Sequence, residues 1–142
     1  MVVVLCGPPG AGMSDAARAS GLVVLDRDDP WWHGEAEFAD AMRSLAGDRA
    51  ARAVVVRAGA TSSARAKASA LCGATHVFVL TAPMHELRRR LAGRGRAGMA
   101  RAMAGVEGWL KAFERSDGVL DFPGWDRIAE ASVGMGSTSR EW

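Results

Sequence analysis

Two kinds of hydrophobic pattern alternate along the first ninety residues of the chain. Short runs that are apolar or nearly so, and mostly rich in valine, occupy residues 2–5, 22–25, 53–56 and 75–80, the last of which begins with Thr75 and His76. Such runs are typical of strands buried on both faces of a parallel sheet. Between and after them, apolar residues recur at helical spacing over residues 14–19, 36–45, 62–71 and 83–92. The alternation predicts a parallel sheet with right-handed crossovers and helices on both faces.

Residues that commonly begin or end helices stand at these boundaries. Gly21 and Gly47 follow the first two predicted helices, where glycine is a frequent terminator. Thr61 or Ser62 is placed to cap the third helix. Pro83 opens the fourth, because proline is favoured in a first turn.

The last third of the chain is less regular. We expect a basic, glycine-punctuated loop over 93–98, a helix over 99–115 and an irregular tail over about 117–142 with a short helix at 125–131. No internal repeat or linker divides the chain, and we expect residues 1–142 to form a single domain.

The turn after the first apolar run carries the most informative motif. It reads Gly7-Pro8-Pro9-Gly10-Ala11-Gly12-Met13-Ser14 and fits G-x-x-x-x-G-K-[ST] at every fixed position except the lysine, which is Met13. Glycines let backbone N–H groups converge on phosphate oxygens, and the Ser14 hydroxyl suits Mg²⁺. The motif predicts that residues 7–14 hold ATP or another nucleoside triphosphate, with Ser14 as a ligand of Mg²⁺.

One residue in this motif and the residue that follows it weaken the predicted affinity for nucleotide. Methionine keeps much of the length of lysine but loses the charge and all three hydrogen-bond donors. Asp15 adds a carboxylate in the first turn of the helix that follows the loop, where it suits the helix dipole but repels a polyphosphate. Both substitutions act in the same direction, so the sequence predicts phosphate transfer that is weak or lost.

Two further segments accompany the loop: Asp26-Arg27-Asp28-Asp29 after the second strand, and an arginine-rich turn after the fourth. With them the chain resembles the small P-loop kinases, most of all the bacteriophage polynucleotide kinase and zeta-toxin-like branch, which includes phage proteins labelled AAA-type ATPases. The resemblance covers about residues 1–98. It implies a three-layer α/β/α fold, a mainly parallel sheet of four or five strands in the order 2-3-1-4, and a lid over ATP.

The resemblance also implies roles for three residues. In the polynucleotide kinase an Arg-Asp-Asp segment supplies the carboxylate that activates the 5′-hydroxyl, and the matching position here is Asp28. A Leu-x-x-Arg-x-x-x-Arg-Gly pattern in the lid places Arg90 and Arg94 as the arginines that face the transferred phosphoryl group. The residues alone leave open a solvated turn at Asp28 and a solvated basic helix end at the arginines.

The family commonly has a Mg²⁺-binding aspartate at the end of the third strand, and this chain has Arg57 there. We expect Arg57 to bind an anion or to pair with Asp26 or Asp28. Trp31 and Trp32 could stack on a nucleic-acid base, although adjacent tryptophans more often pack at the edge of a core or in an interface.

The aromatic residues of the C-terminal third form another group with two interpretations. They are Trp109, Phe113, Phe122, Trp125 and Trp142. Packing against the core is the default, and an interface between copies of the chain is the alternative.

Composition excludes several classes of protein. The chain has 142 residues, 18 basic and 16 acidic side chains and a net charge of +2, and only Lys67 and Lys111 are lysines. No apolar run approaches the ~20 residues of a membrane span. Cys6 and Cys72 lie apart in apolar surroundings, which favours free thiols. We therefore expect a cytoplasmic protein, in the host cytoplasm if it is encoded by a phage.

These features together favour a nucleotide-binding protein of the polynucleotide or nucleoside kinase type with impaired catalysis. The alternative is a non-catalytic interaction or assembly protein that retains the P-loop fold. A third interpretation is single-stranded nucleic-acid binding by the arginines of 88–101 together with Trp31 and Trp32.

Overall fold

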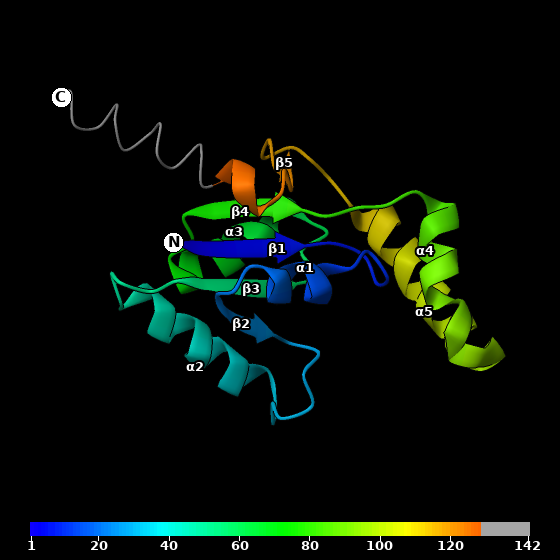
Figure 1. The fold of residues 1–142 in the computed structure, drawn as a ribbon, viewed down its shortest axis with the longest axis horizontal. Helices are drawn as coiled ribbons and strands as arrows, with labels where there is room; N and C mark the ends of the chain where they lie inside the picture. Colours follow the sequence, from blue (N-terminus) through cyan, green and yellow to red (C-terminus); the bar gives the residue numbers. More distant parts are fainter. Residues whose placement is uncertain (129–142) are drawn as a thin grey trace.

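The computed structural model describes residues 1–128, which form a parallel sheet between two layers of helices (Figure 1). Its strands are β1 (Val2–Cys6), β2 (Val23–Asp26), β3 (Ala53–Arg57), β4 (His76–Val79) and β5 (Leu120–Asp121). They lie in the order β2-β3-β1-β4-β5, and every neighbouring pair is parallel. The predicted α/β fold and the strand order 2-3-1-4 are confirmed.

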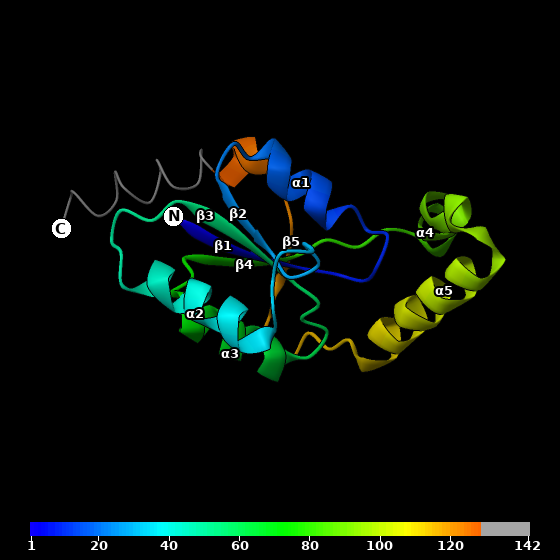
Figure 2. The same ribbon diagram turned by 90° about the horizontal axis from the view of Figure 1, so that it is seen from below.

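The helices lie on both faces of the sheet, as the alternating pattern predicts. They are α1 (Met13–Ala19), α2 (Glu35–Ala46), α3 (Ser62–Cys72), α4 (Met84–Leu91), the 3-10 turn η1 (Ala92–Arg94) and α5 (Gly95–Ala112). Figure 2 shows α1 and the helical turn at 125–128 on one face, and α2 and α3 on the other. The hairpin over 84–112, which we call the lid, projects beyond the carboxyl ends of the strands.

Each face of the sheet has its own hydrophobic core because alternate residues of a strand point to opposite sides. Val4 and Cys6 of β1 pack with Phe38 and Met42 of α2. Leu5, which lies between them, packs in the cluster on the α1 face. Both faces of β1 are therefore covered, which explains why its sequence is apolar without alternation.

The beginning of the lid differs from the prediction. The expected loop over 93–98 is wrong, because η1 ends at Arg94 and α5 starts at Gly95 rather than at residue 99. Glycines lower helix propensity by about 1 kcal/mol each. Burial of Ala102, Val106 and Trp109 along one side of α5 outweighs that local cost.

The tail also differs from the prediction in the part of the chain that the structure describes. Residues 120 and 121 form β5, whose partners in β4 are Phe78 and Val79. Residues 125–128 are helical, and the rest of the expected helix at 125–131 lies outside the described residues. The expectation of an irregular tail therefore missed a fifth strand.

Four aromatic residues of the C-terminal third pack within the chain itself. Trp109 is buried and stacks on Phe113 at 4.6 Å between ring centroids. Phe122 packs edge-on against Trp125, whose Nε1 donates to the carbonyl of Ala16 at 2.8 Å. Packing against the core is confirmed for these four, whereas Trp142 lies outside the described residues. An interface between copies of the chain stays a prediction.

A buried arginine joins the end of the lid to the sheet. Arg65 of α3 is 1% exposed and donates from Nε and NH2 to both carboxylate oxygens of Asp117, at 3.0 and 2.9 Å. It also donates to the carbonyls of Gly59 and Ala60, both at 2.9 Å, and to that of Glu114. These bonds hold the segment that follows α5 against the loop that follows β3.

No helix within residues 1–128 combines the length and apolarity that a membrane span needs.

Candidate functional site

The phosphate loop, residues 7–14, is threaded tightly between the ends of its neighbouring strands. The N–H of Gly7 donates to the carbonyl of Ala58 at 3.1 Å, and a Cβ on Gly7 would come within 2.3 Å of the carbonyl oxygen of Leu80. Gly10 and Gly12 have φ angles of +81° and +87°, which favour glycine. Glycines in such conformations let successive N–H groups turn toward one concave face, as anion binding requires.

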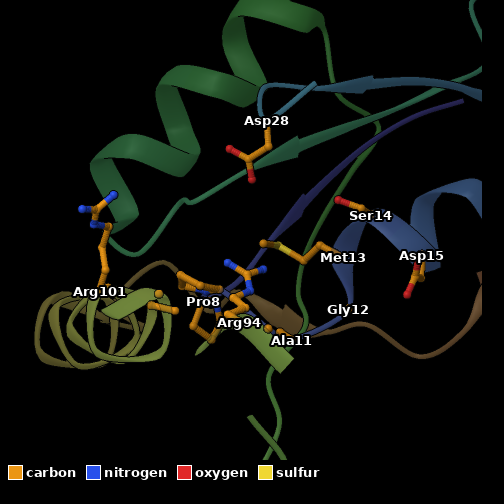
Figure 3. A pocket seen from close by; sticks show the side chains of 14 residues that line it. Pro8, Ala11, Gly12, Met13, Ser14, Asp15, Asp28, Arg94 and Arg101 are labelled. Carbon is orange, nitrogen blue, oxygen red and sulfur yellow. The ribbon is translucent and has the colours of Figure 1, made fainter. Parts of the chain in front are cut away.

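A cavity of about 690 Å³ opens at this loop. The loop lines it from Pro8 to Ser14, Asp28 lies on one side, and Arg94 and Arg101 lie on the side of the lid (Figure 3). The lid therefore borders the same cavity as the phosphate loop, at the carboxyl ends of the parallel strands. Binding sites of open α/β sheets lie at this position.

Ser14 and Asp26 meet at the edge of this region. Asp26 is the last residue of β2 and is 2% exposed, and its Oδ2 accepts a hydrogen bond from the Ser14 hydroxyl. Its Oδ1 accepts from the N–H of Asp28 at 3.0 Å. The contact forms because α1 packs across β1, β3 and β2.

The Ser14–Asp26 pair places an acid beside the loop serine, at the end of β2 rather than at the end of β3, where the family commonly has one. The available signal was a carboxylate directly at the end of an apolar strand, since Asp26 follows Leu25. A hydroxyl and a carboxylate are hard oxygen ligands, and Mg²⁺ needs only one or two protein groups when phosphates complete its shell. The residues present fit that ion, although residues 1–128 contain no cluster of three acidic, histidine or cysteine side chains suited to a metal.

A second cavity of about 450 Å³ adjoins the first. Met13, Asp28 and Pro9 line both cavities, while Asp26, Glu35 and Arg57 line only the second. Asp28 therefore lies where a hydroxyl in the second cavity could meet a phosphate in the first. A carboxylate at such a junction can accept the proton of an attacking hydroxyl.

The two lid arginines expected from the sequence lie on different sides of the loop. Arg94 lines the 690 Å³ cavity, whereas Arg90 lines a third one of about 580 Å³ against Gly12 and Ala16. Arg90 donates to the carbonyl of Gly10 at 3.4 Å and to Glu86 at 2.8 Å. The geometry therefore gives Arg90 a contact that braces the loop, while Arg94 borders the cavity that the loop lines.

Comparison with solved structures identifies the fold. An unliganded sugar kinase from Janibacter sp. HTCC2649 is similar to this chain with a TM-score of 0.56 and 17% identity, over 80% of this chain and 77% of that one. A gluconokinase from Sinorhizobium meliloti 1021 gives a TM-score of 0.59 and 16% identity, over 84% and 79%. This chain has the P-loop kinase fold. No protein-family model and no curated protein sequence matches it.

Arg57, at the end of β3, does not pair as the sequence suggested. Its NH2 lies 2.7 Å from Glu35 Oε1, and its guanidinium lies 5.2 Å from the ring centroid of Phe38. Arg27 binds the other oxygen of Glu35 at 3.0 Å. Hydrogen bonds from Arg57 and then from Arg27 lower the pKa of the Glu35 carboxyl. The expected partners Asp26 and Asp28 were wrong because α2 brings Glu35 to the end of β3.

The adjacent tryptophans have different surroundings. Trp32 donates from Nε1 to the carbonyl of Asp26 at 2.9 Å and packs edge-on against Phe38. Trp32 therefore packs at the edge of the core beside the turn at residues 26–29, which is the more common arrangement expected of adjacent tryptophans, and base stacking by Trp32 stays a prediction. Trp31 is 61% exposed, and base stacking by Trp31 stays a prediction.

Met13 and Asp15 both border the first cavity, and their effect on nucleotide binding stays a prediction. The sulfur of Met13 lies 3.1 Å from where a Cβ on Gly7 would be, and the side chain lines both cavities without a charge. The Asp15 side chain is 93% exposed, lies 3.6 Å from Arg18 and also borders the first cavity. Repulsion of a polyphosphate by Asp15 is therefore screened by solvent.

Gly7→Ala is expected to destabilise the fold by about 1–3 kcal/mol, because the added methyl group overlaps the backbone of Leu80. Gly34→Ala is the matched control, since a Cβ there meets nothing within 4 Å and its φ of 165° is extended. Urea unfolding followed by circular dichroism measures both variants. Equal midpoints for the two would contradict the tight passage of the loop past β4.

Proposed function

We propose that this protein binds a nucleoside triphosphate, represented by ATP, at residues 7–14. The observation that carries the proposal is the single cavity lined by the phosphate loop, by Asp28 and by the lid arginine Arg94. Backbone N–H groups of the loop would bind the phosphates, and Ser14 with Asp26 would hold Mg²⁺. The bound ion would neutralise charge on the phosphate oxygens.

The second cavity is the proposed site of the phosphate acceptor. Asp28 would take the proton of an acceptor hydroxyl, and Arg94 would face the transferred group. The sugar kinase and the gluconokinase of the same fold support an acceptor with a hydroxyl group. The resemblance to the phage polynucleotide kinase branch favours a nucleoside or the 5′ end of a polynucleotide.

Catalysis at this site is proposed to be weak. A lysine at the position of Met13 would contact the β- and γ-phosphates, and removing one transition-state donor typically costs roughly 10²–10³ in rate. The proposed function is therefore nucleotide binding with slow or lost phosphate transfer.

Calorimetric titration with ATP, with and without Mg²⁺, tests the proposal. Saturation at micromolar ATP supports it, and no saturation at millimolar ATP refutes it. Ser14→Ala is expected to remove most of the gain in affinity that Mg²⁺ provides, because it deletes the hydroxyl beside Asp26. Ser44→Ala is the control, since the Ser44 hydroxyl donates to the carbonyl of Asp40 on the exposed side of α2.

The same titration decides the second candidate, a non-catalytic interaction or assembly protein on this fold. Met13 favours it, because the loop lacks the charged donor of a lysine, and the Asp15 carboxylate adds a smaller repulsion that solvent screens. A folded protein that fails to bind ATP with Mg²⁺ at millimolar concentration would support this candidate.

A further inference from the structure

The lid turns a cationic face toward the phosphate loop. Arg94, Gly98, Arg101 and Gly105 follow one another at spacings of three or four residues and all line the 690 Å³ cavity. Residues with this spacing share one side of a helix. The two glycines leave space between the arginines, so that the guanidinium groups are the bulky polar groups on this side of the cavity.

Neither Arg94 nor Arg101 has a carboxylate partner among residues 1–128. Other arginines near the site are paired: Arg89 and Arg90 share Glu86, and Arg57 binds Glu35. The same cavity is also lined by the carboxylates of Asp15 and Asp28, which lie away from the lid. On the side of the lid, two cations without an ion pair beside a loop of N–H groups are suited to an anion.

Packing fixes the position of this face relative to the loop. Ala11 of the phosphate loop is buried in one cluster with Leu91 of α4 and with Ala102 and Val106 of α5. A Cβ on Gly105 would lie 3.3 Å from the Cγ atom of Pro9, so α5 passes close to the loop. The arginines are therefore carried by an element that packs on the loop itself.

The other end of α5 is also anchored. Trp109 donates from Nε1 to the carbonyl of Ala58 at 2.6 Å, and the N–H of Glu114 donates to that of Ala60 at 3.2 Å. Contacts in the middle of α5 and at its C-terminal end hold the helix across the site. The backbone that carries the two exposed arginines is therefore held in place, and a side chain on such a helix loses less freedom on binding than one on a free loop.

We propose that Arg94 and Arg101 together supply the positive charge that the phosphate loop lacks at Met13. The polyphosphate is bound between the N–H groups of the loop on one side and the two guanidinium groups of the lid on the other. Guanidinium groups suit this task because their forked donors match phosphate oxygens. The inference rests on the proposed nucleotide site and adds Arg101, which no sequence motif indicated.

Binding of two probes, ATP with Mg²⁺ and inorganic tripolyphosphate, measures this contribution. Arg101→Gln and Arg94→Gln are each expected to weaken both probes about tenfold, as the loss of one charge-assisted hydrogen bond does. Arg88→Gln and Arg96→Gln remove the same charge from exposed lid positions that do not line the cavity. These controls are expected to keep the wild-type affinity at 150 mM salt.

The same substitutions in a Met13→Lys background test replacement directly. With a lysine in the loop, loss of Arg101 is expected to cost about threefold or less, because two groups that serve one function are not additive. An equal cost in both backgrounds would overturn the inference, and so would wild-type affinity in the Arg94 and Arg101 variants. Binding by Met13→Lys but not by the wild type would overturn it as well. If neither protein binds either probe, the proposed function itself fails.

Discussion

Replacing Met13 by lysine is expected to raise the affinity for ATP with Mg²⁺ by roughly 10- to 100-fold, the value of one charge-assisted hydrogen bond of about 1.5–3 kcal/mol. Met13 already lies along the border of the two cavities. A lysine of similar length would place its ammonium group where the phosphates meet Asp28. Calorimetry measures the gain in affinity.

Slow phosphate transfer is expected to accelerate in the same variant. A positioned donor at the transferring group typically contributes roughly 10²–10³ in rate. Release of ADP from ATP, measured in a coupled assay with and without candidate hydroxyl acceptors, reports this gain.

Leu110→Lys is the matched control for Met13→Lys. It adds the same charge to α5 at a residue that is 42% exposed and lines none of the cavities described above. If it increases ATP affinity as much as Met13→Lys does, the gain comes from net charge alone. An unchanged affinity in Met13→Lys would show that position 13 does not contact the phosphates.

Arg65→Ala is expected to destabilise the protein by about 3–5 kcal/mol, because it removes a large buried side chain and leaves backbone carbonyls without their donor. The substitution leaves Asp117 without its partner and leaves the carbonyls of Gly59, Ala60 and Glu114 without their donor. Urea unfolding followed by tryptophan fluorescence gives the free energy of unfolding. The loss is large relative to the total stability of about 5–15 kcal/mol of a typical domain.

Arg43→Ala is the control for this variant. Arg43 pairs with Asp40 at 2.7 Å, but both side chains are more than half exposed, so the expected cost is below about 1 kcal/mol. Similar free energies of unfolding for the two variants would contradict a structural role for Arg65.

Acid titration gives a second measure of the Arg65 cluster. Hydrogen bonds from Arg65 lower the pKa of Asp117 from its ordinary value of 3.8. The stability that the pair provides is therefore complete above that value and is lost as the pH falls through the lowered pKa of the folded state. Arg65→Ala and Asp117→Asn are both expected to remove this part of the acid sensitivity.

Most of the strands and helices could be predicted from the sequence, because apolar runs and capping residues within a few positions specify them. The four apolar runs became β1 to β4, and Thr61 caps α3 by accepting from the N–H of Ala64 at 3.1 Å. β5 was not predicted, because its two exposed residues, Leu120 and Asp121, show no periodic pattern of apolar positions. They are a strand only because residues of β4 lie beside them.

The sequence by itself determined the strand–loop–helix unit at residues 1–19, the alternation of strands and helices, and the absence of a lysine at position 13. These features depend on neighbours within a few positions. Only the tertiary structure decided that Asp26 accepts a hydrogen bond from Ser14 and that Glu35 forms an ion pair with Arg57. It also decided that Arg101 lines the same cavity as the phosphate loop. Each of these partners comes from another element of the fold. Whether these residues come into contact depends on how the helices cross the sheet. The distance between residues on different elements cannot be read from their spacing along the chain.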